Sequence, residues 1–172
     1  MTAILDTLDP DFRALIDLVL ADLASDGLTF RPYFGRRDPV TQAALWRQSR
    51  SRAVVDRTIE TLRAEGCDFL AGCFDKAGPR DGPWATNALP GQSWHQFGEA
   101  VDCVLLDAMG HADWRDTRYR RYGEVAEKHG LRWGGRFGDF DHLQKRLIEP
   151  PAAFGSMKTI NDRLAAEWPG LL

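Results

Sequence analysis

The sequence predicts an α+β fold built as one compact domain. Segments with helical periodicity are mixed with short strand-like segments, and they show no regular β-α-β alternation. No internal repeat, low-complexity segment or linker divides the 172 residues. This length suits a single hydrophobic core, so we expect one domain over 1–172.

The amino-terminal part of the chain contains the clearest helical pattern. Apolar residues recur three and four positions apart over 12–23. Asp9 is suited to cap this helix, Pro10 to occupy its first turn and Gly27 to end it. A short strand is expected next, over 28–34.

Two more helices are predicted before the middle of the chain. Asp38 and Pro39 form a second cap and first turn, which indicates a helix over 40–48. A third helix is expected over 53–64. Glycine and proline are dense over 66–91, which favours loops and short strands there.

Short strands and helices follow one another in the second half of the chain. The apolar segment 100–106 is strand-like although Asp102 lies inside it. Asn161 is a suitable cap for a last helix. The remaining predicted elements are a helix over 117–128, strands over 131–133 and 142–148, and a helix over 161–168.

Charge and hydropathy exclude several classes of partner. The net charge is −3, and the chain has no basic tail, so we expect no nucleic-acid partner. No apolar stretch is long enough to span a bilayer, so no membrane insertion is expected. Residues 1–12 lack the features of a signal peptide. We therefore expect synthesis in the cytoplasm, and something else must let the chain through if its substrate lies outside the membrane. We also expect a monomer.

The cysteines do not indicate a disulfide framework. Their number is odd, and they are Cys67, Cys73 and Cys103. We expect buried free thiols, which behave as small apolar groups. A bridge between Cys67 and Cys73 is the alternative.

Two of the four histidines have neighbours that indicate a catalytic zinc site. Such a site takes three protein ligands and leaves one position for water. His95, Asp102 and His142 would supply two nitrogens and one oxygen. A carboxylate inside an apolar strand is costly unless it is paired or bound to a metal. Gly98 allows the chain to turn between His95 and Asp102, and His142 begins a separate strand.

A general base is also needed beside the metal. Asp139 precedes His142 by three residues, in a turn opened by Gly138. From there it could take a proton from a water molecule activated by zinc. Asp141 is the alternative base, but on a strand its side chain would point to the face opposite His142. We therefore prefer Asp139.

The two histidine segments contain motifs of a known family. The first is S-x-H-x-x-G-x-A-x-D, and the second is L-x-W-G-G followed by D-x-x-H; their residues are Ser93, His95, Gly98, Ala100 and Asp102, and Leu131, Trp133, Gly134, Gly135, Asp139 and His142. With these motifs the chain resembles the zinc peptidases of the hedgehog/DD-peptidase fold, which include VanY-like D-alanyl-D-alanine carboxypeptidases and the L-alanyl-D-glutamate endopeptidases of phage endolysins and bacilli. The resemblance implies a small antiparallel sheet with helices packed around it, zinc at the three ligands named above, and Asp139 as the base.

The resemblance extends upstream and covers about 28–144. Arg37 and Gln42 match an R-x-x-x-x-Q segment, which implies that Arg37 contacts the substrate and steadies the oxyanion, although Arg36 is adjacent. The segment 48–80 is longer than expected and contains an extra helix, which we expect to flank the cleft.

The resemblance implies a zinc-dependent peptidase that hydrolyses peptidoglycan stem peptides. An aspartate base is typical of the endopeptidase branch, which favours an endolysin-like L-alanyl-D-glutamate endopeptidase. One alternative is a D-alanyl-D-alanine carboxypeptidase. An alternative of another class is a non-catalytic, zinc-stabilised module that binds cell wall or protein.

Other residues near the motifs have two interpretations. Ser93 could orient a ligand or serve as a turn hydroxyl, and Trp133 could line the cleft or pack in the core. Glu99 occupies a variable position of the first motif and is expected to be exposed. His111 is expected on the surface, and His129 at a helix end where the dipole favours a cation.

Overall fold

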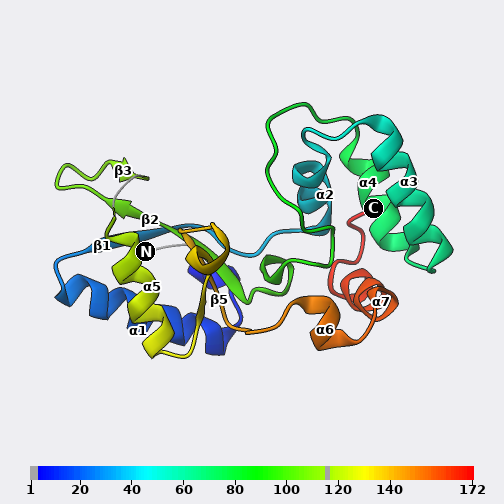
Figure 1. Ribbon diagram of the computed structural model, residues 1–172. Coiled ribbons are helices and arrows are strands. Elements are labelled where there is room, and N and C mark those ends of the chain that lie inside the picture. Colours follow the sequence, from blue (N-terminus) through cyan, green and yellow to red (C-terminus); the bar gives the residue numbers. More distant parts are fainter. Residues whose placement is uncertain (1–3, 115–116) are drawn as a thin grey trace. The chain divides into compact units, whose positions relative to one another are not determined.

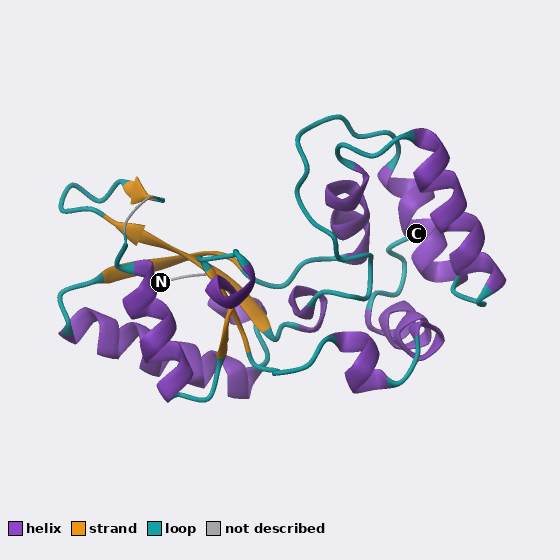
Figure 2. Cartoon of the chain, viewed as in Figure 1, coloured by secondary structure: helices purple, strands orange, loops and turns teal. Residues whose placement is uncertain are grey.

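The computed structural model describes residues 4–114 and 117–172. Contacts divide the chain into two compact units, Met1–Arg36 with Phe97–Leu147 (unit 1) and Arg37–Gln96 with Ile148–Leu172 (unit 2). Figure 2 shows the strands in unit 1, whereas the described part of unit 2 consists of helices and loops. The predicted α+β class is therefore confirmed.

Unit 1 opens with a short 3-10 helix, η1 (Leu5–Thr7), and the long helix α1 (Pro10–Ser25). Asp9 caps α1 by accepting a hydrogen bond of 3.1 Å from the amide of Phe12. Gly27 follows the helix with a φ of 75°, a left-handed conformation that glycine adopts without strain. The predicted start and end of this helix are confirmed.

The sheet of unit 1 is small and antiparallel. Its strands run in the order β1 (Thr29–Phe34), β2 (Ala100–Leu106), β5 (His142–Gln144) and β4 (Arg132–Trp133), and β3 (Ala112–Asp113) pairs with the end of β2. Asp102 lies at the centre of this register, opposite Phe34 on one side and His142 on the other. The register thus brings two of the predicted metal ligands together.

Helices α1 and α5 (Tyr119–Lys128) pack against each other along the sheet (Figure 1). The Phe30 ring of β1 stacks on Tyr122 of α5 with the ring centroids 4.5 Å apart. His129 ends α5, as predicted, and its Nε2 lies 2.8 Å from a carboxylate oxygen of Asp22 on α1. The core between these elements contains Phe12, Ile16, Val19, Leu23, Val101, Leu105, Val125 and Leu143.

Unit 2 is a cluster of helices. Helix α4 (Asp68–Ala77) contacts α2 (Pro39–Arg47), α3 (Arg52–Ala64) and α7 (Met157–Glu167), and α6 (Pro150–Phe154) contacts α7. Its buried side chains include Trp46, Ile59, Leu70, Phe74, Ile160 and Leu164. The 3-10 helix η2 (Trp94–Phe97) follows the long loop after α4, and η3 (Gly134–Phe137) follows β4 in unit 1.

The prediction of loops and short strands over 66–91 is wrong for 68–77, which form α4, whereas 78–91 form a loop as predicted. Leu70, Ala71 and Phe74 recur at helical spacing and are fully buried, so tertiary packing overrides the effect of the glycines. The Leu172 side chain packs against Gly72 inside α4. A Cβ at this position would lie 2.7 Å from that side chain, so the close packing favours glycine there.

Two predicted boundaries near the carboxyl end are also wrong. The last strand ends at Gln144 rather than at 148. The last helix begins at Met157 and is capped by Ser156, whose hydroxyl accepts from the amide of Thr159 at 3.1 Å. Asn161 lies inside that helix, where its side chain accepts from the amide of Leu70 at 3.1 Å. The sequence-based prediction missed α6.

The three cysteines are free and buried, so the expectation of unpaired thiols is confirmed. Among the described helices, none combines the length and apolar character needed to cross a membrane.

Gly98 fixes the turn between η2 and β2. Its φ is 71°, and its carbonyl accepts from the amide of Asp9 at 2.9 Å. A Cβ at this position would lie 3.0 Å from that same Asp9 nitrogen. A side chain would therefore meet both an unfavourable backbone conformation and a fixed neighbour.

We predict that Gly98→Ala lowers the free energy of unfolding by about 2–3 kcal/mol, measured by chemical denaturation. Gly110→Ala is the matched control, because Gly110 has a φ of 81° with no atom within 4 Å of the added Cβ. The control should lose only about 1 kcal/mol, from backbone strain alone. Equal losses would show that the approach to Asp9 is unimportant.

Candidate functional site

Three buried side chains converge on one point. His95 of η2, Asp102 of β2 and His142 of β5 each offer a ligand atom, and these atoms lie within 4.8 Å of one another. His142 Nδ1 lies 3.0 Å from Asp102 Oδ1. The structure thus brings together the three side chains that the motifs predict as metal ligands.

Gln144 orients the ring of His142. His142 Nε2 donates to Gln144 Oε1 at 3.2 Å, and Gln144 Nε2 donates to the carbonyl of Arg146 at 2.7 Å. Nδ1, the ring nitrogen that faces Asp102, is therefore the one available to a metal. Partners of this kind fix the orientation of metal-binding histidines. The sequence analysis missed Gln144, although its spacing of two from His142 on a strand signals a shared face.

The surroundings of His142 favour positive charge. Burial lowers the pKa of its imidazole, but the hydrogen bond to Asp102 and the charges of Asp102 and Asp139 outweigh that effect and raise the pKa above its ordinary value. A buried carboxylate next to two imidazoles is costly without a cation. Two nitrogens and one oxygen are also a common ligand set of catalytic zinc, so these residues fit a divalent metal ion.

Backbone and indole contacts in unit 2 position His95. Its carbonyl accepts from the amide of Arg37 at 3.0 Å. The neighbouring Trp94 is buried and donates from Nε1 to the carbonyl of Ile148 at 2.8 Å. Ser93 is half-buried, and its hydroxyl makes no hydrogen bond to another described residue, so the role of orienting a ligand has no contact that supports it here.

The loop that carries Asp139 folds back on Gly134. The amide of Asp139 donates to the carbonyl of Gly134 at 3.0 Å, and the amide of His142 donates to the carbonyl of Asp139 at 3.3 Å. A Cβ on Gly134 would overlap Asp139 and would lie 2.8 Å from the Cβ of His142. Gly138 adopts a φ of 92° and opens the turn, as predicted. Asp139 is thereby held close to His142.

Trp133 packs against the same loop. Its indole fills the space that side chains on Gly123 of α5 and Gly135 would need. Its Nε1 donates to the carbonyl of Phe140 at 2.8 Å. Trp133 is partly buried and packs against the core of unit 1, which supports the packing interpretation.

Asp139 and Asp141 have different surroundings. Asp139 is exposed by its accessible surface, yet the surrounding protein desolvates its carboxylate. This desolvation is the largest cause that raises the pKa of Asp139 to about 6, the positive charge of His142 opposes it, and the neighbouring Asp141 and Asp102 add to it. The carboxylate of Asp141 accepts a hydrogen bond from the hydroxyl of Tyr33. A carboxylate with a pKa near 6 is suited to act as a general base at neutral pH.

Arg37 is held by the glutamine of its motif. Arg37 Nη1 donates to Gln42 Oε1 at 2.9 Å, and Gln42 Nε2 donates to the carbonyl of Ala88 at 2.8 Å. Gln42 is fully buried and Arg37 is half-buried. Arg36 is exposed, and its amide donates to the Thr7 hydroxyl at 3.0 Å. The R-x-x-x-x-Q spacing therefore produces a cation whose orientation is fixed.

The prediction that Glu99 is exposed is wrong. Its side chain is only 9% accessible and forms an ion pair with Arg146, with Nε and Oε2 2.7 Å apart. A position that varies within a motif gives no signal for such a partner in a distant segment. His111 is exposed on the surface, as predicted.

Three solved structures of peptidases are similar to this chain. The L-Ala D-Glu endopeptidase ChiX of Serratia marcescens is 20% identical, with a TM-score of 0.48 and 83% of each chain covered. The zinc complex of the D,D-pentapeptidase VanY from a VanB-type resistance cassette is 19% identical, with a TM-score of 0.47 over 80% of this chain and 71% of that one. VanYB in complex with D-alanine-D-alanine is 18% identical, with a TM-score of 0.46 over 96% and 84%. No curated protein sequence matches the chain.

A family described as D-alanyl-D-alanine carboxypeptidase matches residues 86–145. The matched segment is about a third of the chain and contains both motifs, from Ser93 to Asp102 and from Leu131 to His142. The prediction of a peptidase is thereby confirmed. Residues 86–145 thus carry the sequence signature of the D-alanyl-D-alanine carboxypeptidase family, as the two motifs indicated.

Proposed function

We propose that this chain is a zinc-dependent peptidase that hydrolyses the stem peptides of bacterial peptidoglycan, with residues 1–172 acting as one peptidase domain. One observation carries the proposal. His95, Asp102 and His142 offer ligand atoms within 4.8 Å of one another in a buried setting, inside the segment that matches a peptidase family.

Zinc is the metal that fits this donor set best. Two imidazole nitrogens and one carboxylate oxygen leave a coordination position open for water or substrate. When bound, the ion would polarise the scissile carbonyl and lower the pKa of a water molecule to about 7. Gln144 would keep the ring of His142 in the orientation that this role requires.

Asp139 is the proposed general base. With a pKa of about 6 its carboxylate is largely ionised at neutral pH, so it can take a proton from the attacking water. The same carboxyl group can then hand the proton to the leaving amine. Asp141 is less suited, because the Tyr33 hydroxyl donates to its carboxylate.

Arg37 is the proposed contact for the substrate. Its guanidinium is oriented by Gln42, and a guanidinium suits the recognition of a carbonyl or carboxylate oxygen. A fixed cation at this place would steady the negative charge that develops on the attacked carbonyl oxygen.

The bond that we propose as the target is the L-alanyl–D-glutamate bond. An aspartate at position 139 favours the endopeptidase branch by resemblance, and an endolysin-like monomer released through a membrane hole is the accompanying proposal. A D-alanyl-D-alanine carboxypeptidase is the second candidate, favoured by the family that matches 86–145. A non-catalytic zinc-stabilised module is the third.

Digestion of purified sacculi separates these candidates. The zinc-loaded protein is incubated with sacculi, and the masses of the released fragments are determined. Stem peptides that begin at glutamate support the endopeptidase. Release of single alanines alone supports the carboxypeptidase, and intact sacculi support the non-catalytic module.

We predict one zinc ion per chain, and less than about a tenth of that for His95→Ala, because two ligands hold zinc far less tightly than three. Elemental analysis after dialysis measures the content. His111→Ala is the control, since His111 lies on the surface, and it should retain one ion. Undiminished zinc in His95→Ala would contradict the ligand set.

We predict that Asp139→Asn keeps its zinc but lowers kcat about 10²–10⁴-fold, because the amide cannot accept the proton. Release of fragments from sacculi measures the rate. Asp141→Asn is the matched comparison and should lose less than about tenfold. The reverse order of the two variants would make Asp141 the base.

We predict that Arg37→Lys lowers kcat/KM about 10²-fold, because lysine cannot keep both the bond to Gln42 and the oxyanion contact. The same sacculus assay measures it. Arg36→Lys, at the adjacent exposed position, should leave the rate unchanged. Similar rates for the two variants would remove Arg37 from the proposed site.

A further inference from the structure

We propose that the ion pair between Glu99 and Arg146 is a positioning device for the metal centre, one that holds the two strands carrying Asp102 and His142 in register. Glu99 immediately precedes β2, and Arg146 lies two residues after β5. The inference rests on the proposed function, because it concerns the geometry of the same ligands.

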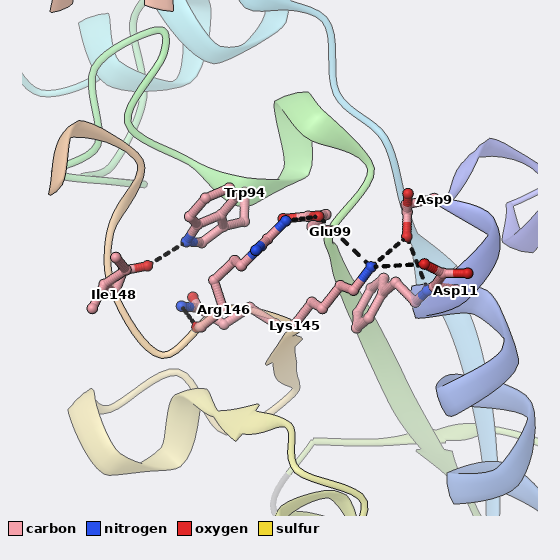
Figure 3. Close-up of polar contacts among 9 residues, drawn as sticks. Asp9, Asp11, Trp94, Glu99, Lys145, Arg146 and Ile148 are labelled. Carbon is pink, nitrogen blue, oxygen red and sulfur yellow. Dashed lines mark hydrogen bonds and ion pairs between the residues drawn. The ribbon is translucent and has the colours of Figure 1, made fainter. Parts of the chain in front are cut away.

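The pair is bidentate, as Figure 3 shows. Arg146 Nε donates to Glu99 Oε2 at 2.7 Å, and Arg146 Nη2 donates to Glu99 Oε1 at 2.9 Å. Two parallel charge-assisted bonds fix both the distance and the angle between the groups. A pair of this kind is therefore suited to holding two backbone segments in one arrangement.

The backbone continues the sheet through the same two segments. Ala100 pairs with Gln144 in the ladder, and the amide of Lys145 donates to the carbonyl of Glu99 at 2.9 Å. The ion pair closes this end of the β2–β5 ladder, and Asp102 faces His142 two residues further along.

Lys145 connects this end of the β2–β5 ladder to helix α1. Its ammonium group donates to Asp9 Oδ1 at 2.8 Å and lies 3.7 Å from Asp11 Oδ2 and 3.9 Å from Glu99 Oε1 (Figure 3). Burial opposes the ionised form of Asp9, but the hydrogen bonds from Lys145 and the Phe12 amide outweigh it and lower its pKa. The cap of α1 and the end of the ladder thus share one cation.

A continuous set of contacts leads from the ion pair to a ligand. The carbonyl of Arg146 accepts from Gln144 Nε2 at 2.7 Å, and Gln144 Oε1 accepts from His142 Nε2 at 3.2 Å. The position of Arg146 therefore affects the orientation of the His142 ring through Gln144. On the other strand, Glu99 precedes Asp102 by three residues.

Because the Glu99 carboxylate is buried, it needs the positive charge of Arg146 beside it. The side chain of Glu99 is 9% accessible, whereas that of Arg146 is 53% accessible. Loss of the arginine would leave a buried carboxylate whose remaining ion-pair partner, Lys145, lies 3.9 Å away. The segment would then have to move for Glu99 to reach water, and the facing strands would move with it.

The test compares Arg146→Ala with Arg121→Ala. Arg121 is a matched control within unit 1, because its Nε donates to Asp26 at 2.8 Å and its Nη1 donates to Glu124 at 3.3 Å, on the surface. Zinc affinity is measured by competition with a chelator, and the visible absorption of the cobalt-loaded protein reports ligand geometry. Exchange of the Lys145 amide is followed in metal-free protein.

We expect Arg146→Ala to weaken zinc binding about tenfold or more, to change the cobalt spectrum and to speed exchange at Lys145. Arg146→Lys should recover part of the affinity, and Arg121→Ala should bind zinc normally. Normal zinc affinity and an unchanged cobalt spectrum in folded Arg146→Ala would overturn the proposal. Should the unaltered protein bind no zinc, the proposed function fails, and exchange at Lys145 then decides alone whether the pair holds the two strands.

Discussion

The structure depends on one costly arrangement, a carboxylate buried in the middle of a sheet. Asp102 lies on β2 with apolar neighbours, opposite His142 on β5. A charge in that place destabilises the fold unless a cation or an imidazolium balances it. His142 contributes to that balance, because Asp102 raises the pKa of its imidazole against the effect of burial. The requirement for stability and the capacity to hold a metal therefore involve the same residues.

Much of this site follows from the sequence because its parts are local. Asp9 and Pro10 begin a helix, Gly98 turns the chain, and Gly138 opens the loop before His142. Each of these effects acts within a few residues, where spacing and conformational preference are informative. The meeting of His95 with Asp102 and His142 was predictable only because the two motifs occur together.

The remaining features depend on contacts that spacing does not encode. Glu99 pairs with Arg146, which lies 47 positions away in the sequence, so the burial of Glu99 could not be expected from its own segment. Helix α4 forms in a glycine-rich stretch because Leu70 and Phe74 gain a buried environment from other helices. Gln144 is different, since its position two residues after His142 on a strand could have revealed its role.

Trp133 links the chemistry of the site to the interior of unit 1. Its indole occupies the room left by Gly123 on α5 and supports the loop that presents Asp139. Helix α5 packs against the tryptophan at Gly123 and therefore limits where the Asp139 carboxylate can lie. Selection for activity would therefore also constrain Gly123, although this residue has no reactive group of its own.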